Sequence, residues 1–205
     1  MVRVKVCGIT NSKDAMIAVS YGADAIGFVF TRSPRQISTE KAAVISRALH
    51  PFVARVGVFA DARLGDVKKT IKQCCLTAVQ LHGNETPRYC QKITTVSVIK
   101  AFRVKDENSL AKIHDYDVDA VLLDSFVEGK LGGTGEPFNW VLIQKINKPL
   151  VLAGGLNINN VKKAIQKIRP YAVDVSTGVE YRPGKKDPRK LRQFIRMVKG
   201  ESSWT

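Results

Sequence analysis

The segment VRVKVCGI (residues 2–9) begins a pattern that decides the fold of this chain. Its β-branched residues indicate a buried strand. SKDAMIAVSYG (12–22), which follows it, has helical patterning between a plausible N-cap, Ser12, and Gly22. A strand followed by a helix is the repeating unit of a parallel sheet, because parallel strands need a long crossover connection. The number of such units along the chain therefore determines which parallel fold it adopts.

Seven more strand-like runs follow the first, and segments with helical patterning separate them. In those segments Ser38 or Thr39 is a candidate N-cap, and Pro87 stands near a first helical turn, where its missing N–H costs little. Eight units are the number that closes a (β/α)8 barrel, so we predict a single-domain α/β TIM barrel over residues 1–205, with 200–205 as a frayed tail. An open doubly wound sheet is the alternative, but no GxGxxG motif follows the first strand. The further runs are 23–30, 53–60, 77–82, 97–102, 120–125, 150–155 and 172–177.

The chain has 205 residues and a formal net charge of +15. A strongly basic chain can bind nucleic acid, yet its lysines and arginines are spread over the predicted helices and the C-terminal segment, and no nucleic-acid motif is present. We therefore expect no nucleic-acid partner, and a basic surface that either is only solvated or attracts small anionic substrates. Because the sequence has no signal peptide and no run of about 18 apolar residues, we expect a cytoplasmic protein with no membrane partner.

The four cysteines, Cys7, Cys74, Cys75 and Cys90, form no CxxC pair and show no zinc-ligand spacing. Cys74 and Cys75 are neighbours in a predicted helix, so at most one of them faces the core. Cys7 alone stands next to a glycine at the end of a strand. The sequence therefore predicts no metal site, and it singles out Cys7 as the cysteine with a candidate chemical role.

Two glycine-bearing loops are placed where barrels of this class bind phosphate. The active site lies at the C-terminal ends of the strands, and the loops after the seventh and eighth strands usually hold the phosphate group. The seventh run ends in Gly154 and Gly155, which let backbone N–H groups approach an anion because no Cβ intrudes. The eighth ends in Ser176, Thr177 and Gly178, which add hydroxyl and amide donors. Such glycines can also serve only tight turns, but two loops in the expected places favour a phosphorylated small-molecule substrate.

Two ionisable groups end strands on the same face of the predicted barrel. Asp124 ends an apolar strand, where a carboxylate needs partners because burying its charge is costly. It is therefore either a cap or ion-pair partner, or a functional acid. Cys7 acts as a base only as a thiolate, which needs a positive or donor-rich setting, and Lys5 points to the same side of its strand. Cys7 and Asp124 are a candidate acid–base pair.

Three further side chains have competing interpretations. Arg35, in SPRQIS, has a fork that suits a carboxylate in bidentate fashion, and it is either a substrate-binding residue or a solvated loop arginine. Lys100 could form the Schiff base of a class I aldolase, although a lysine near a strand end is more often an ion-pair partner. His82 could be catalytic, but a histidine beside a rim glycine is more often structural. We therefore keep Arg35 as a candidate and treat Lys100 and His82 as structural.

A set of short motifs occurs in order along the chain and resembles the phosphoribosylanthranilate isomerase family, the (β/α)8 enzymes of tryptophan biosynthesis. The resemblance runs from Lys5 to the GKKDPRKLRQF stretch. AGGL alone occurs in several phosphosugar barrels, whereas KVCGIT together with GGTG and DVSTGVE is much more specific. One departure is Asn139, where the family often has aspartate before the tryptophan; both residues cap helices well. The motifs are KVCGIT, SPRQIS, GVFA, QLHG, IKAF, LLDS, GGTGEPFNW, LAGGLN and DVSTGVE.

The resemblance implies an isomerase that carries out an Amadori rearrangement. Its substrate would be N-(5-phosphoribosyl)anthranilate and its product 1-(2-carboxyphenylamino)-1-deoxyribulose 5-phosphate. Carried over by position, Cys7 is the general base, Asp124 is the general acid and Arg35 holds the anthranilate carboxylate. The resemblance also implies no cofactor, and a monomer or a homodimer. The phosphate would be held by the loops at Gly154, Gly155, Ser176, Thr177 and Gly178.

Two other functions stay open at this point. Indole-glycerol-phosphate synthase, another barrel of the same pathway, shares the phosphate loops, but its catalytic lysines and glutamates are not found at matching strand ends here. A basic barrel that binds RNA would leave the placement of Cys7 and Asp124 unexplained. Loss of the substrate's anthranilate-type fluorescence separates the isomerase from both alternatives.

Overall fold

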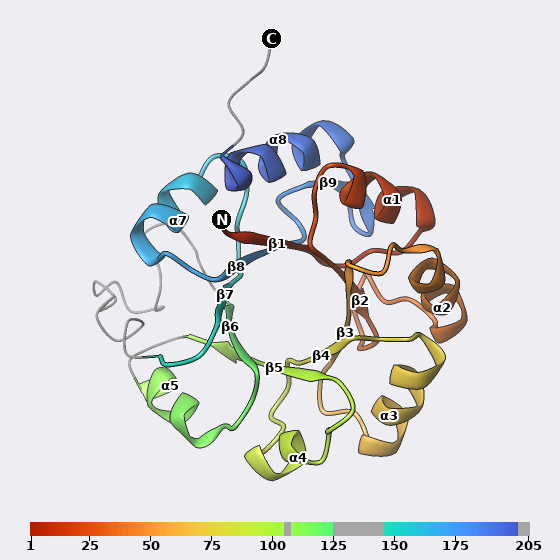
Figure 1. The fold of residues 1–205 in the computed structure, drawn as a ribbon, viewed down its shortest axis with the longest axis vertical. Coiled ribbons are helices and arrows are strands. Elements are labelled where there is room, and N and C mark those ends of the chain that lie inside the picture. The colour runs from red at the N-terminus through yellow and green to blue at the C-terminus, as the bar shows by residue number, and fades with distance from the viewer. Residues whose placement is uncertain (105–107, 125–145, 201–205) are drawn as a thin grey trace.

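The computed structural model describes residues 1–104, 108–124 and 146–200, and in it eight parallel strands close into a barrel with helices around the outside (Figure 1). The strands lie in chain order, and β1 pairs with β8 to close the barrel. Each predicted run overlaps one strand, and only β5 extends beyond its run, by one residue, so the predicted TIM barrel is confirmed. The strands are β1 (Arg3–Val6), β2 (Ala25–Val29), β3 (Ala54–Phe59), β4 (Ala78–Leu81), β5 (Ser97–Arg103), β6 (Ala120–Asp124), β7 (Leu150–Leu152) and β8 (Ala172–Val175).

Two of the helices begin where the sequence predicts helix-starting residues. Ser38 caps α2 by accepting a hydrogen bond from the Lys41 amide, and Pro87 is the first residue of α4, both as predicted. The predicted cap Ser12 is wrong by one residue, because the Asn11 side chain accepts from the Asp14 amide and Ser12 is already helical. The helices are α1 (Ser12–Ser20), α2 (Thr39–Ala48), α3 (Leu64–Gln73), α4 (Pro87–Gln91), α5 (Asn108–Ala111) with the 3-10 turn η1 (Lys112–Asp115), α7 (Val161–Ile168) and α8 (Pro188–Lys199).

The main core lies between the barrel and the surrounding helices. Helix α8 shows why these residues form it: its buried side chains recur at helical spacing and make one apolar stripe, at Leu191, Phe194, Ile195 and Val198. Cys74 is buried in this layer while Cys75 is exposed, as the sequence predicted. Inside the barrel the apolar clusters are small, which leaves room for buried polar side chains beneath its C-terminal end.

A short antiparallel hairpin after β8 was not predicted. It consists of β9 (Glu180–Arg182) and β10 (Lys185–Lys186), and Thr10 donates a hydrogen bond to the Gly184 carbonyl at its turn. This contact ties the hairpin to the β1–α1 loop and brings Glu180 and Lys186 beside the C-terminal end of the barrel.

Two predicted segments lie wholly or largely outside the described residues: the C-terminal tail, and the glycine-rich loop with the helix that follows it. Gly200 ends α8 in the left-handed conformation, with φ 73°, so this first residue of the predicted tail is a helix cap. Residues 201–205 are not described, and neither are the glycine-rich loop 127–137, Asn139 and most of the predicted helix 138–146. The extent of the single domain therefore stays a prediction.

Candidate active site

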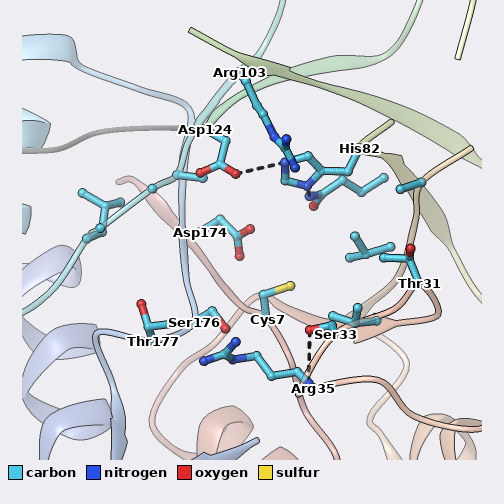
Figure 2. Close-up of a pocket in the computed structure, with 18 of the residues that line it drawn as sticks. Cys7, Thr31, Ser33, Arg35, His82, Arg103, Asp124, Asp174, Ser176 and Thr177 are labelled. Carbon is cyan, nitrogen blue, oxygen red and sulfur yellow. Dashed lines mark hydrogen bonds and ion pairs between the residues drawn. The ribbon is translucent and has the colours of Figure 1, made fainter. Parts of the chain in front are cut away.

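The C-terminal end of the barrel holds a pocket of about 500 Å³. Figure 2 shows Cys7 and Asp124 pointing into this pocket from different strands, with Arg35, Ser176 and Thr177 along one side. Gly154 and Gly155 also line it. The fold therefore brings seven of the eight predicted site residues, which are far apart in the chain, to one cavity.

Cys7 follows directly on β1 and its thiol is nearly covered. The residue is 8% exposed, packs against Val29 and Val58, and donates its backbone N–H to the Val175 carbonyl. Burial raises the pKa of the Cys7 thiol above its ordinary value, although the ammonium group of Lys5 opposes this shift. The sequence predicted a positive setting that would favour the thiolate; the structure has the cations, but burial outweighs them.

Asp124 ends β6 on the opposite wall of the pocket, and its partner is a histidine. His82 Nε2 lies 2.9 Å from Asp124 Oδ2 (Figure 2). His82 stands one residue after β4, where its backbone N–H donates to the Phe59 carbonyl. The sequence analysis treated His82 as structural, but the structure places it in the pocket, in contact with the candidate acid.

A buried polar network lies on the barrel side of these groups. Lys5 Nζ donates to Asp174 Oδ2 at 2.8 Å and to Gln80 Oε1 at 2.9 Å. Gln80 Nε2 in turn lies 3.0 Å from His82 Nδ1. Burial opposes the charge of Lys5, but the Asp174 carboxylate and the Cys7 sulfur outweigh it and raise the pKa of the Lys5 ammonium. The network thus places a cation beneath the thiol and connects it to the Asp124 side.

Arg35 lines the pocket, but its guanidinium is held by a carboxylate that the sequence analysis did not name. Its Nη2 lies 2.7 Å from Glu180 Oε2, and its Nε also bonds to Glu180. Lys186 Nζ donates to the other oxygen of Glu180 at 2.9 Å. Burial opposes the charge of Glu180, but the hydrogen bonds from Arg35 and Lys186 outweigh it and lower its pKa. Arg35 and Lys186 together carry two positive charges and Glu180 carries one negative charge, so this wall of the pocket has a net positive charge.

Two consecutive glycines in the loop after β7 have left-handed backbone conformations. Gly154 and Gly155 have φ of 86° and 63°, which only glycine adopts readily. Asn157 and Asn160 both donate their side-chain amides to the Gly155 carbonyl and so fix the loop before α7. Gly154 and Gly155 line the same pocket as Ser176 and Thr177.

Gly178 is the one predicted site residue that does not line the pocket, and its role is close packing. A Cβ at this position would lie 2.0 Å from the Leu156 carbonyl oxygen. An isolated parallel bridge joins Gly178 to Asn157 at the same point. The two predicted phosphate loops are therefore in backbone contact, and Gly178 makes that contact possible.

Lys100 has the structural role that the sequence analysis favoured. Its ammonium lies 2.9 Å from Glu85 Oε2 and donates to the carbonyls of Leu81 and Gly83. Its side chain is 3% exposed, so it is enclosed by these acceptors. This arrangement does not present a lysine nucleophile to the pocket and disfavours the aldolase interpretation.

Among the described residues, no cluster of three or more histidine, cysteine, aspartate or glutamate side chains could hold a metal ion. None of the described helices is both long enough and apolar enough to cross a membrane.

Two of the residues that the sequence analysis missed, Gln80 and Asp174, share one signal with Lys5. Lys5, Gln80 and Asp174 are polar residues within strands, two positions before Cys7, His82 and Ser176 respectively. Since side chains alternate along a strand, each pair points to the same side, here the barrel interior. The alternation could have identified Gln80 and Asp174 from sequence. It could not have shown which of these side chains touch.

The chain is similar to known proteins over nearly its whole length. The sequence profile described as N-(5'-phosphoribosyl)anthranilate isomerase matches residues 4–197. The chain belongs to this isomerase family. The enzyme of that name from Geobacter sulfurreducens is 50% identical over 203 residues, covering 98% of this chain and all of that one. The Thermotoga neapolitana enzyme is 47% identical over 205 residues, with 98% and 100% covered.

Solved structures of the family match the barrel over almost its whole length. A structure from Thermotoga maritima, described as monomers generated from a dimeric phosphoribosylanthranilate isomerase, superimposes with a TM-score of 0.87 at 44% identity, covering 98% of this chain and 100% of that one. A second structure, with the same TM-score, identity and coverage, is described as a complex with reduced 1-(o-carboxyphenylamino)-1-deoxyribulose 5-phosphate. A thiamine phosphate pyrophosphorylase at 14% identity and TM-score 0.69 shares the fold alone.

Proposed function

We propose that this protein is a phosphoribosylanthranilate isomerase of tryptophan biosynthesis in the cytoplasm. It would convert N-(5'-phosphoribosyl)anthranilate into 1-(2-carboxyphenylamino)-1-deoxyribulose 5-phosphate with Cys7 as base and Asp124 as acid. The observation that carries the proposal is the convergence of Cys7 and Asp124 on one pocket, next to the glycine-bearing loops, in a chain of this family. A relative in complex with a reduced form of that aminoketose phosphate supports the choice of substrate.

The reaction needs one group that gives a proton and one that takes a proton. Asp124 gives its proton to the furanose ring oxygen, the bond from that oxygen to C1 breaks, and the substrate opens to a protonated Schiff base. This cation makes the proton on C2 acidic, and the Cys7 thiolate removes it to leave an enolamine. The enolamine then tautomerises to the ketone. Each proton transfer assisted in this way contributes roughly 10²–10⁴-fold.

The substrate's two anionic groups suit two parts of the pocket: the glycine-bearing loops after β7 and β8, and the wall formed by Arg35. The phosphate would lie against Gly154 and Gly155 and the Ser176–Gly178 loop, where backbone N–H groups and hydroxyls are available. The anthranilate carboxylate would bind the guanidinium of Arg35, whose wall is positive because Lys186 offsets Glu180. Neither the proton transfers nor the binding of these two groups requires a metal ion or a cofactor. The oligomeric state stays a prediction of monomer or homodimer.

Turnover of purified protein, followed by loss of the substrate's fluorescence, tests the proposal. Cys7→Ser and Asp124→Asn should each lower kcat by about 10²-fold or more while the fold survives. Cys75→Ser and Asp117→Asn are matched controls, because Cys75 is exposed and the Asp117 side chain is 90% exposed. A rate near wild type in both Cys7→Ser and Asp124→Asn would contradict the assignment of base and acid.

A further inference from the structure

The hydrogen-bond roles along one chain of side chains follow from chemistry alone. Lys5 Nζ faces one end of the Gln80 amide at 2.9 Å. An ammonium group can only donate, so the Gln80 atom that faces it is the carbonyl oxygen. The amide nitrogen of Gln80 then faces His82 Nδ1 at 3.0 Å. An amide NH₂ group can only donate as well, so His82 Nδ1 is the acceptor and carries no proton.

The remaining proton of the neutral imidazole is therefore on Nε2, which lies 2.9 Å from Asp124 Oδ2 but is not aligned with it as a hydrogen bond in this structure. We propose that Lys5 and Gln80 fix His82 with its proton on Nε2, so that this N–H becomes a hydrogen-bond donor to Oδ2 of Asp124 when the bound substrate aligns the two side chains, which makes His82 a positioning residue for the acid. The inference rests on the proposed function for the role of Asp124, but the direction of the hydrogen bonds does not depend on it.

The direction matters because a carboxylic acid has two different oxygens. A donor at Oδ2 makes Oδ2 the carbonyl oxygen of protonated Asp124, so the proton to be transferred is on Oδ1. His82 keeps its own proton and orients the carboxyl group. The proton thus leaves Asp124 from one defined atom, and geometry of this kind is what proton transfer to a bound sugar requires.

Lys5 begins the Lys5–Gln80–His82 chain of hydrogen bonds, and it can only be the donor in its bond to Gln80. Lys5 is 4% exposed and is paired with Asp174 at 2.8 Å, so it stays an ammonium donor. The other charged groups that face His82 come from the neighbouring strands: Arg103 from β5 and Asp174 from β8 line the same pocket, and Asp61 and Lys100 line the adjoining hollow. In Figure 2 Arg103 and Asp124 lie on the His82 side, and Cys7 lies across the pocket.

Nitrogen-15 NMR of histidine-labelled protein tests the direction without any substrate. In spectra recorded at about pH 8, the chemical shifts of the two nitrogens of a ring report which one carries the proton. His50 and His114, both exposed, serve as internal references for rings with mixed tautomers. We expect His82 to be wholly in the Nε2–H form, and His82→Gln assigns its signals by their loss. A mixed or Nδ1–H ring at His82 would overturn the proposal.

Gln80→Glu replaces the amide donor by an acceptor of the same shape, and it should move a proton onto His82 Nδ1. If His82 keeps an unprotonated Nδ1 in this variant, Gln80 does not set the tautomer of His82, and the proposal is contradicted. If the variant does not fold, the wild-type spectrum decides alone.

Kinetics tests whether the donor positions the acid. His82→Leu should lower kcat by up to about 100-fold, the cost of a misplaced catalytic group, with little change in KM. His82→Gln keeps an N–H donor near Nε2 and should recover most of that loss. Equal loss in both variants, or a change confined to KM, would overturn the positioning role. An active Asp124→Asn variant would instead contradict the proposed acid and leave the NMR result unaffected.

Discussion

At the residue scale, the environment of Cys7 combines two opposed effects. Burial raises the pKa of the thiol, and the ammonium groups of Lys5 and Lys186 lower it without cancelling the effect of burial. In the free enzyme the thiol is therefore mostly protonated at neutral pH, whereas the proposed base must be a thiolate. The active fraction of the enzyme then grows as pH rises toward the pKa of Cys7.

A pH profile checks this directly. Between about pH 6 and about pH 9, the ascending part of the pH profile of kcat/KM should rise by up to about tenfold per pH unit. This part reflects deprotonation of the base, since kcat/KM follows the ionisation of groups in the free enzyme. The measurement is initial rates at low substrate, with thermal unfolding at each pH to show that the fold is unchanged. A limb that levels off near pH 7 would mean that the base titrates lower and is not this buried thiol.

Arg35 gives a second prediction at this scale. Arg35→Ala should raise KM by about 10- to 100-fold, because a charge-assisted hydrogen bond contributes about 1.5–3 kcal/mol. Stability should change less than binding, since Glu180 keeps its bond to Lys186. Arg182→Ala, at an exposed arginine of β9, is the matched control. Unchanged KM and kcat in Arg35→Ala would remove Arg35 from the site.

At the scale of elements, the site depends on two loops that touch through Gly178. Gly178→Ala should push the loops after β7 and β8 apart, because its Cβ would lie 2.0 Å from a backbone oxygen that cannot give way cheaply. We expect a loss of about 1–3 kcal/mol in the free energy of unfolding. A higher KM should accompany it, because the same loops would hold the phosphate.

Thermal unfolding and inhibition by inorganic phosphate measure the two effects of Gly178→Ala separately. Gly65→Ala is the control, since a Cβ there has no neighbour within 4 Å and Gly65 lies in α3. That change should be neutral or stabilising by up to about 1 kcal/mol. Gly178→Ala with the same melting temperature and phosphate affinity as wild type would show that the two loops are not coupled.

The scale of elements also shows what periodicity can predict. All eight strands were found because runs buried on both faces leave a continuous apolar signal. The β9–β10 hairpin was missed because it consists of short, largely polar segments whose order depends on contacts such as Thr10 with Gly184. The helix start at Asn11 was misplaced by one residue because neighbouring Asn and Ser are both good caps.

At the scale of the whole molecule, the chain has a formal net charge of +15, and its proposed substrate carries two anionic groups, a phosphate and a carboxylate. A positive field speeds the encounter with an anion and is screened by salt, with a Debye length of about 10 Å at 0.1 M. We expect kcat/KM to fall several-fold as KCl rises from about 0.05 M to about 0.5 M, with kcat nearly constant. Stopped-flow rates at limiting and saturating substrate distinguish the two constants. A kcat/KM that does not depend on salt would leave the high charge without a role in capture.

The sequence by itself determined the barrel, the face of the site and the types of residue at the strand ends. These depend on the alternation of elements and on side-chain period, both of which are local properties. Only the tertiary structure decided which groups meet: Arg35 with Glu180, His82 with Asp124, and Lys5 with Gln80 and Asp174. These pairs are separated by up to 169 residues, and ring closure of the barrel brings them within hydrogen-bonding distance. Hydrogen bonds act over about 3 Å, so a pattern read along the chain identifies the groups but not their partners.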